Sequence, residues 1–161
     1  MSSFLPQQPI DEKALSAALG LMEVGRFSAA LRVLGEIRVD DHVVGAFALG
    51  VCLFRAGAYE RAAGCFEKSL AALKRMKPLG MAVTKTDEYM ALRVREIAEQ
   101  TYLTPLRIDV MTAGFLESAR EDMIMAAAEA YFQCGDVNRA QTRINSLNGA
   151  EFDQIKARIN Q

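Results

Sequence analysis

His42 is the one histidine in the sequence, and it directly follows Asp40 and Asp41. An imidazole and two carboxylates could supply part of a metal site. No second histidine and no pair of cysteines at ligand spacing supplies the remaining ligands. Asp is also preferred just before a helix, where its carboxylate accepts hydrogen bonds from the first backbone N–H groups. We therefore expect the two acids to cap the apolar helix that follows, and we expect no metal and no cofactor.

Cys52, Cys65 and Cys134 are the remaining candidates for nucleophilic chemistry. Each lies in a helical pattern beside apolar neighbours, and cysteine is among the residue types most often buried. A nucleophilic cysteine needs a base or an electropositive setting, which the sequence does not indicate. An odd number of cysteines without a close pair is typical of unpaired thiols in a reducing compartment, which predicts a cytoplasmic protein.

Other signatures of enzymes are missing from the sequence. It contains no G-x-S-x-G motif, no phosphate-binding loop and no dinucleotide-binding fingerprint. Paired acids such as Asp87 and Glu88 lie at expected helix starts, where the helix dipole explains them. We therefore predict that the protein is not an enzyme.

The composition favours a helical protein that neither binds nucleic acid nor inserts into membranes. Of the 161 residues, 51% are apolar and only 7% are aromatic, a balance typical of closely packed helices. The 19 basic and 20 acidic residues give a net charge of −1, whereas nucleic-acid binders usually carry a basic surplus. The first residues lack the basic start and apolar core of a secretory signal. The longest charge-free apolar run, Val43 to Phe54, is too short to cross a bilayer.

The clearest pattern of secondary structure in the sequence lies over residues 46–66. Gly57 can take the positive φ that ends a helix, and the small residues Gly50 and Ala62 would let two antiparallel helices approach closely. Apolar and small residues at helical spacing complete the pattern: Ala46, Leu49, Leu53, Tyr59 and Phe66. We expect a helix on each side of Gly57, with Tyr59 and Phe66 filling the space between them.

The same spacing occurs twice more in the chain. Gly25 precedes Gly57 by 32 residues, and Gly135 ends another helical pattern near the C-terminus. The residues two, five and nine positions after each glycine are apolar or small. They are Phe27, Ala30 and Leu34 after Gly25; Tyr59, Ala62 and Phe66 after Gly57; and Val137, Ala140 and Ile144 after Gly135. The sequence therefore predicts three helical hairpins.

Residues 46–66 resemble a tetratricopeptide repeat (TPR), whose signature is W-x2-L-G-x2-Y, then A-x3-F, then P. Leu49, Gly50, Ala62 and Phe66 match this signature, and the spacing of 32 residues is close to the roughly 34 of the family. The resemblance implies an all-α fold of TPR-like antiparallel hairpins, stacked in a right-handed α-solenoid with a C-terminal capping helix. It also implies a binding scaffold rather than a catalyst.

The expected organisation is a flexible lead over residues 1–10 and a single TPR-like helical domain over 11–161. Its repeats lie near 11–40, 43–76 and 119–148. The third repeat opens at the capping-box pattern Ser118-Ala119-Arg120-Glu121. A diverged helical hairpin is expected over 86–117, with Leu106 to Leu116 as its second helix, and a capping helix over 150–160.

In proteins that this chain resembles, the first helices of successive repeats line a concave groove that holds a peptide. The resemblance places ten residues in that groove: Leu15, Leu19, Met22, Phe47, Val51, Phe54, Arg55, Met125, Glu129 and Phe132. Because this set is mainly apolar, the expected partner is a protein or peptide with hydrophobic anchors. The alternative is that these residues pack against a neighbouring repeat, the middle hairpin or a second copy of the chain.

The leading hypothesis is a non-catalytic adaptor or chaperone that binds a hydrophobic peptide segment. One alternative is a self-associating structural repeat protein whose apolar faces form a homo-oligomer. Another is an enzyme or small-molecule sensor with a pocket between the middle hairpin and the repeats. In length, hairpin number and apolar groove, the chain is also similar to the cytoplasmic tandem-TPR chaperones of bacterial type III secretion.

Overall fold

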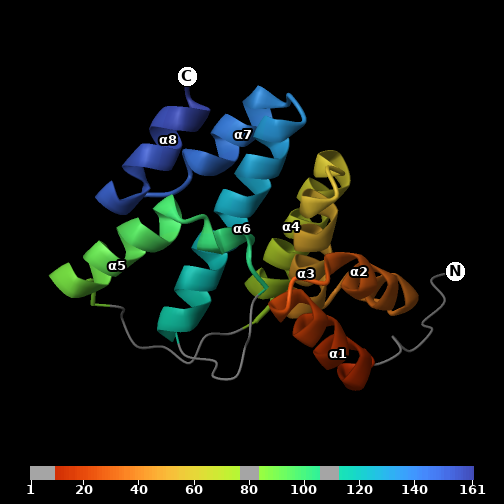
Figure 1. Cartoon of the computed structure of the whole chain (residues 1–161). Coiled ribbons are helices and arrows are strands. Elements are labelled where there is room, and N and C mark those ends of the chain that lie inside the picture. The colour runs from red at the N-terminus through yellow and green to blue at the C-terminus, as the bar shows by residue number, and fades with distance from the viewer. Residues whose placement is uncertain (1–9, 77–83, 106–112) are drawn as a thin grey trace, which may run out of the picture.

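The computed structural model describes residues 10–76, 84–105 and 113–161, and within them every regular element is a helix (Figure 1). The elements in chain order are α1 (Glu12–Glu23), α2 (Phe27–Glu36), α3 (Val43–Arg55), α4 (Tyr59–Lys74), α5 (Asp87–Ala98), the 3-10 helix η1 (Thr101–Leu103), α6 (Ala113–Gln133), α7 (Val137–Ile144), the 3-10 helix η2 (Ala150–Phe152) and α8 (Asp153–Ile159). The all-α fold class is therefore confirmed.

Three pairs of helices are joined by the same glycine turn. Gly25 links α1 to α2, Gly57 links α3 to α4 and Gly135 links α6 to α7, with φ of +78°, +79° and +86°. Gly57 N–H donates to the Phe54 carbonyl at 3.0 Å, and Ala58 N–H donates to the Leu53 carbonyl at 2.9 Å. The equivalent two bonds close the other turns, as in the Schellman motif. The predicted positive φ at Gly57 is confirmed.

α3 and α4 approach closely because a glycine and an alanine lie where they meet. A Cβ atom on Gly50 would lie 2.6 Å from Cε1 of Phe66, and Ala62 is fully buried. Phe66 also packs against Phe47, with ring centroids 5.1 Å apart. The predicted role of Gly50 at this meeting point is confirmed.

Most helices pack on their neighbours in the chain. α1 packs on α2, α2 on α3, α3 on α4, α4 on α6, α6 on α7 and α7 on α8. α6 stands in the middle of the molecule, with α3 and α4 on one side and α5 and α8 on the other (Figure 1). α5 lies outside the sequential order and contacts η1, η2 and α8. The stacking of these pairs as a right-handed TPR solenoid stays a prediction.

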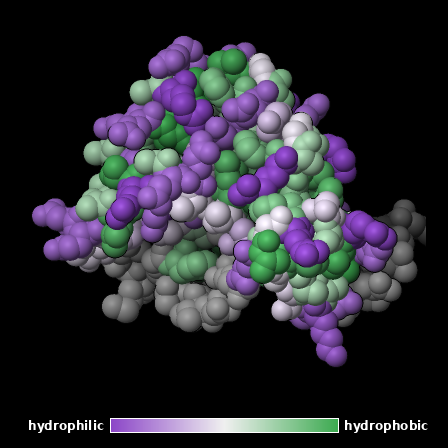
Figure 2. Space-filling model, viewed as in Figure 1, coloured by the Kyte–Doolittle hydropathy of each residue, from purple (hydrophilic) through white to green (hydrophobic). Residues whose placement is uncertain are grey.

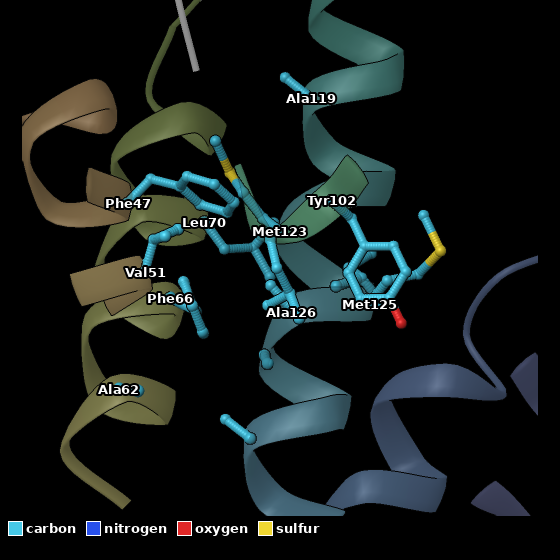
Figure 3. Packing of buried hydrophobic residues seen from close by; sticks show 14 of the residues in the cluster. Phe47, Val51, Ala62, Phe66, Leu70, Tyr102, Ala119, Met123, Met125 and Ala126 are labelled. Atoms are coloured by element: carbon cyan, nitrogen blue, oxygen red, sulfur yellow. The ribbon is translucent and has the colours of Figure 1, made fainter. Parts of the chain in front are cut away.

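The core is continuous between α3, α4 and α6 (Figure 3). Phe47 and Val51 come from α3, Phe66 and Leu70 from α4, and Met123 from α6; each is 2% exposed or less. These side chains fix α6 against the second helix pair, so that residues of α4 and α6 can line one site.

α6 begins earlier than the sequence pattern predicts. It is continuous over 21 residues, so the predicted helix start at the capping-box pattern is wrong. Ser118 and Glu121, the first and last residues of that pattern, contact α5 instead. The Ser118 hydroxyl lies 3.3 Å from the Tyr89 hydroxyl, and Glu121 accepts a hydrogen bond from Arg93 at 3.3 Å. Tertiary contacts therefore account for residues that the local pattern assigned to a helix cap.

The remaining expected segments are partly outside the described residues. The flexible lead falls there except for Ile10, and so do residues 106–112 of the helix expected over 106–116. The last residues of that expected helix belong to α6. α5 occupies the place of the first helix of the expected middle hairpin, and η2 with α8 occupies that of the capping helix.

Candidate functional site

His42 caps α3, and its acidic neighbours pair with α4 and the residue that follows it. Nδ1 of His42 accepts a hydrogen bond from Gly45 N–H at 3.1 Å. The Asp40 carboxylate lies 3.1 Å from Lys68, and the Asp41 carboxylate lies 3.4 Å from Arg75. The prediction that the acids cap this helix is therefore wrong. Across residues 10–76, 84–105 and 113–161, no three His, Cys, Asp or Glu side chains are grouped so as to hold a metal ion.

The three free cysteines lie in different environments. Cys52 is buried in α3, Cys65 is half-buried in α4, and Cys134 is exposed just after α6, so the prediction of burial is wrong for Cys134. Burial raises the pKa of the Cys52 thiol to about 11, against the opposing charge of Arg55. Burial also raises the pKa of Cys65. A thiol with a raised pKa is a poor nucleophile at neutral pH.

Most residues expected in a peptide groove are buried within the chain. Six of the ten are 4% exposed or less: Leu15, Met22, Phe47, Val51, Met125 and Glu129. Phe47 packs on Phe66 of the return helix, whereas the groove required it to face away from that helix (Figure 3). A side chain without exposed surface cannot contact a peptide. The groove expected at these six positions is therefore filled by the chain itself.

On α6, the expected groove positions are covered by later parts of the chain. Arg158 of α8 donates to Glu129 Oε2 at 2.5 Å, and its guanidinium lies 5.7 Å from the centroid of the Phe132 ring. Tyr102 of η1 lies beside Met125 (Figure 3). α8 therefore occupies part of the surface that the resemblance assigned to a ligand.

Four expected groove residues keep part of their surface. Leu19, Phe54 and Phe132 are half-buried and Arg55 is exposed. The Arg55 guanidinium lies over the Phe27 ring, 4.3 Å from its centroid, and Phe54 packs edge-on against Tyr59 at 5.0 Å. On the face seen in Figure 2, hydrophobic and hydrophilic residues are interspersed.

An open cleft lies between α4, α6 and α7. It has a volume of about 400 Å³ and is lined by Glu67, Tyr131, Arg139, Thr142 and Arg143. We call it the Tyr131 cleft. The glycine turn at Gly135 positions it, because that turn folds α7 back along α6 and sets the two arginines beside Tyr131.

Glu67 and Arg143 form a two-point ion pair in the Tyr131 cleft. Arg143 Nε donates to Glu67 Oε1 at 2.6 Å, and Arg143 Nη2 donates to Oε2. The Tyr131 hydroxyl also donates to Oε1, at 3.4 Å. Burial and the Glu67 charge raise the pKa of Tyr131, so its hydroxyl stays protonated at neutral pH. Both oxygens of Glu67 are thus occupied by donors from α6 and α7.

Arg139 is the more weakly held cation of the Tyr131 cleft. Its side chain is 70% exposed, and its Nε lies 3.5 Å from Asp136 Oδ2. Its guanidinium lies 5.7 Å from the centroid of the Tyr131 ring. Asp136 already accepts a hydrogen bond from the Arg139 backbone N–H at 3.2 Å as the cap of α7. Exposed ion pairs contribute little free energy, so Arg139 can exchange this partner for another carboxylate at small cost.

Local sequence patterns do not reveal the Tyr131 cleft, because the residues on its two sides are far apart in the chain. Glu67 and Arg143 are separated by 76 residues, and no local pattern connects them. One signal was available: Arg139 and Arg143 are four residues apart on α7, a spacing that places both on one helix face. Their partner on α4 emerges only from the packing of α4 on α6.

Within the part of the chain that the structure describes, no helix combines the length and the apolar character that a membrane span requires. Comparison with known proteins found no matching family model, no matching curated protein and no matching solved structure.

Proposed function

We propose that the protein is a non-catalytic protein-binding module of the helical-repeat type, which holds a side chain of its partner in the Tyr131 cleft. The observation that carries the proposal is the cleft itself, where an aromatic ring and two arginines meet at the junction of three helices. Tyrosine and arginine are among the residues that contribute most to protein–protein binding. Because they stand on packed helices rather than on a loop, little ordering is needed when a partner binds.

The partner group that fits the Tyr131 cleft best is a carboxylate. Arg143 uses two of its five N–H donors on Glu67, and the Arg139 guanidinium has one exposed ion pair, with Asp136. Spare guanidinium donors pair well with carboxylates, because two parallel hydrogen bonds can form. Both oxygens of Glu67 are occupied, so Glu67 competes little for these donors. An Asp or Glu side chain of a partner would pair with Arg139 and lie against the Tyr131 ring.

Few of the apolar residues predicted to line a groove remain accessible to a partner. Leu19, Phe54 and Phe132 are the apolar groove residues that a partner could reach, and they can add hydrophobic contact around the main site. A chaperone role in secretion, a homo-oligomer and a cytoplasmic location stay predictions from the sequence.

Site-specific photo-cross-linking in the organism's own cells tests the proposal. A photoreactive residue at Thr142 lies in the Tyr131 cleft, and one at Ser16, exposed on α1, is the matched control. We expect a discrete protein adduct from position 142 and not from position 16. Adding Arg139→Ala to the Thr142 variant should abolish the adduct, while the circular dichroism spectrum stays unchanged.

An adduct that forms equally from both positions would contradict the proposal, and so would one that persists without Arg139. The absence of any protein adduct at position 142 would also contradict it. In that case titration of the purified protein with small carboxylates distinguishes a small-molecule site from no site.

A further inference from the structure

The buried face of α5 combines one charged side chain with one aliphatic side chain, and Tyr89 and Met90 are half-buried beside them. Arg93 and Ile97 are its buried residues, whereas Leu92 is 60% exposed and Val94 is 40% exposed. A helix usually docks through an apolar stripe, and in α5 that stripe contributes one buried aliphatic side chain. The strength of docking therefore depends in part on the charges around Arg93.

Arg93 lies among carboxylates from its own helix and from α6. It is 3% exposed, and its guanidinium lies 2.8 Å from Asp122, 3.3 Å from Glu121 and 3.3 Å from Glu96. It also donates to the Ser118 carbonyl at 3.4 Å. Its Nε has no hydrogen-bond partner among the described residues, so the pairing is incomplete.

A second charged contact holds the chain just before α5. Lys85 Nζ donates to Oε1 of Glu151 in η2 at 2.6 Å, and the Glu151 side chain is almost fully buried. The other Glu151 oxygen, Oε2, has no hydrogen-bond partner among the described residues. We call the six charged residues of these two contacts the Arg93 cluster: Lys85, Arg93, Glu96, Glu121, Asp122 and Glu151.

The Arg93 cluster contains more acid than base. Two cations face four carboxylates. The other titratable groups facing it do not correct this excess, because Glu117 and Arg120 of α6 pair with each other at 3.4 Å and Tyr89, whose hydroxyl lies 3.3 Å from the Ser118 hydroxyl, supplies no positive charge. Enclosing like charges together is costly when too few opposite charges are present. The cluster can relieve that cost by binding a proton.

We propose that α5 is a proton-linked cover of α6: its docking takes up protons into the Arg93 cluster, so that α5 is held tightly in mild acid and loosely at neutral pH. Release of α5 would expose Ile97 and the α6 face that carries Ser118, Glu121 and Asp122. The device controls access to a surface at the N-terminal half of α6, apart from the Tyr131 cleft, and does not depend on the function proposed for that cleft.

The titration of the carboxylates supports this direction. Burial raises the pKa of Asp122 from its ordinary 3.8 to about 6, against the opposing effect of Arg93. Burial likewise raises the pKa of Glu121. When α5 leaves, both carboxylates regain water and lose protons. Docking therefore binds protons between about pH 4 and pH 6 and weakens as the pH rises through that interval.

Glu151 acts in the opposite sense at lower pH. Burial alone would raise its pKa, but the hydrogen bond from Lys85 lowers it below the ordinary 4.5. Its contribution to docking is thus complete above about pH 4.5 and is lost only below that value. Between pH 5 and pH 7.5 the effect of Asp122 and Glu121 decides the result.

Hydrogen exchange of the full chain, followed by mass spectrometry from pH 4.5 to pH 7.5, tests the proposal. After correction for intrinsic exchange rates, protection of residues 87–98 should fall by roughly tenfold between pH 4.5 and pH 6 and then level off, because one proton changes an equilibrium by at most about tenfold per pH unit. Residues 59–74 of α4 belong to the core and report unfolding of the whole chain, so residues 87–98 should be less protected than α4 at every pH if α5 is released on its own.

Two variants and one control isolate the cluster. Asp122→Asn should flatten the pH dependence of residues 87–98, and Glu121→Gln should reduce it if Asp122→Asn does not fold. Glu36→Gln, at an exposed position on α2, should leave it intact. Protection that is constant or rises with pH would overturn the proposal. So would protection of residues 87–98 equal to that of α4 at every pH, or full pH dependence in the folded cluster variant.

Discussion

Gly50 and Gly64 lie inside the two helices of one hairpin but differ in what a side chain would meet. A Cβ on Gly50 would lie 2.6 Å from Phe66 Cε1 and 3.2 Å from Cys65 Cβ, whereas a Cβ on Gly64 meets nothing within 4 Å. Alanine favours a helix by about 1 kcal/mol over glycine, and overpacking costs about 1 to 3 kcal/mol. Chemical denaturation should show that Gly50→Ala destabilises the protein, while Gly64→Ala stabilises it by up to about 1 kcal/mol. Equal effects at both positions would contradict the close approach of α3 and α4.

Phe47 and Phe54 lie on the same helix but contribute differently to stability. Phe47 is fully buried against Phe66, and Phe54 is half-buried against Tyr59. Phe47→Ala should cost about 3 to 5 kcal/mol of unfolding free energy, and Phe54→Ala should cost clearly less. Urea denaturation of both variants checks this. A larger loss of unfolding free energy for Phe54→Ala than for Phe47→Ala would contradict the burial of Phe47 in the core.

The cysteines should differ in reactivity, because the thiolate is the reactive form. Cys134 is exposed, while burial both shields the Cys52 thiol and raises its pKa to about 11. Iodoacetamide at pH 7.5 should therefore label Cys134 first and Cys52 only after unfolding. Peptide mapping against time measures this order, and labelling of Cys52 at the rate of Cys134 in the folded protein would contradict it.

At the scale of the element, α7 depends on its first residue more than longer helices do. It has only eight residues, and the Asp136 side chain caps it by accepting from Arg139 N–H at 3.2 Å. Short helices have few internal hydrogen bonds to offset a lost cap. Asp136→Ala should cost about 1 kcal/mol in thermal or chemical unfolding, and Asp136→Asn, which can still cap, should cost less. No difference between the two variants would show that α7 is held by packing alone.

Helix pairs could be predicted from the sequence because their signals are local. Gly25, Gly57 and Gly135 each end a helix through a turn that requires positive φ, and that requirement is visible in the residue type. The start of α6 could not be predicted in this way. Ser118 and Glu121 have the spacing of a cap, but the packing of α5 brings Tyr89 and Arg93 to them.

The candidate site was harder to predict than the helices. α3 is apolar nearly all round, so its sequence does not say which face meets α4; Phe47 turned out to face Phe66. The covering of Glu129 by Arg158 and the meeting of Glu67 with Arg143 both join residues far apart in the chain. Such contacts depend on the arrangement of whole helices, which periodicity does not specify.

At the scale of the whole molecule, buried carboxylates should give stability an unusual dependence on pH. The pKa of Asp122 is raised to about 6 in the folded protein, so the folded state binds more protons than the unfolded state between about pH 4 and pH 6. The free energy of unfolding therefore falls as the pH rises through that interval. Glu151, whose pKa is lowered, acts in the opposite direction, but only below about pH 4.5.

We expect the unfolding free energy to be about 1 to 2 kcal/mol higher at pH 5 than at pH 7.5, since one pKa unit corresponds to about 1.4 kcal/mol. Urea denaturation across this range, at constant ionic strength, measures it. Stability that rises steadily from pH 5 to pH 7.5 would contradict the burial of protonated carboxylates.

The packing of α4 on α6 also has a consequence during synthesis on the ribosome. Among the described residues, α1 to α4 pack on one another and α4 also packs on α6, and 38 residues separate the end of α4 from the start of α6. At about 5 to 20 residues per second, the α4 face that will meet Met123, including Ser69 and Leu70, waits for roughly 2 to 8 s without its partner. A nascent chain halted in this interval presents an apolar strip that the finished protein does not show, and the holding chaperones of the cell would recognise it there.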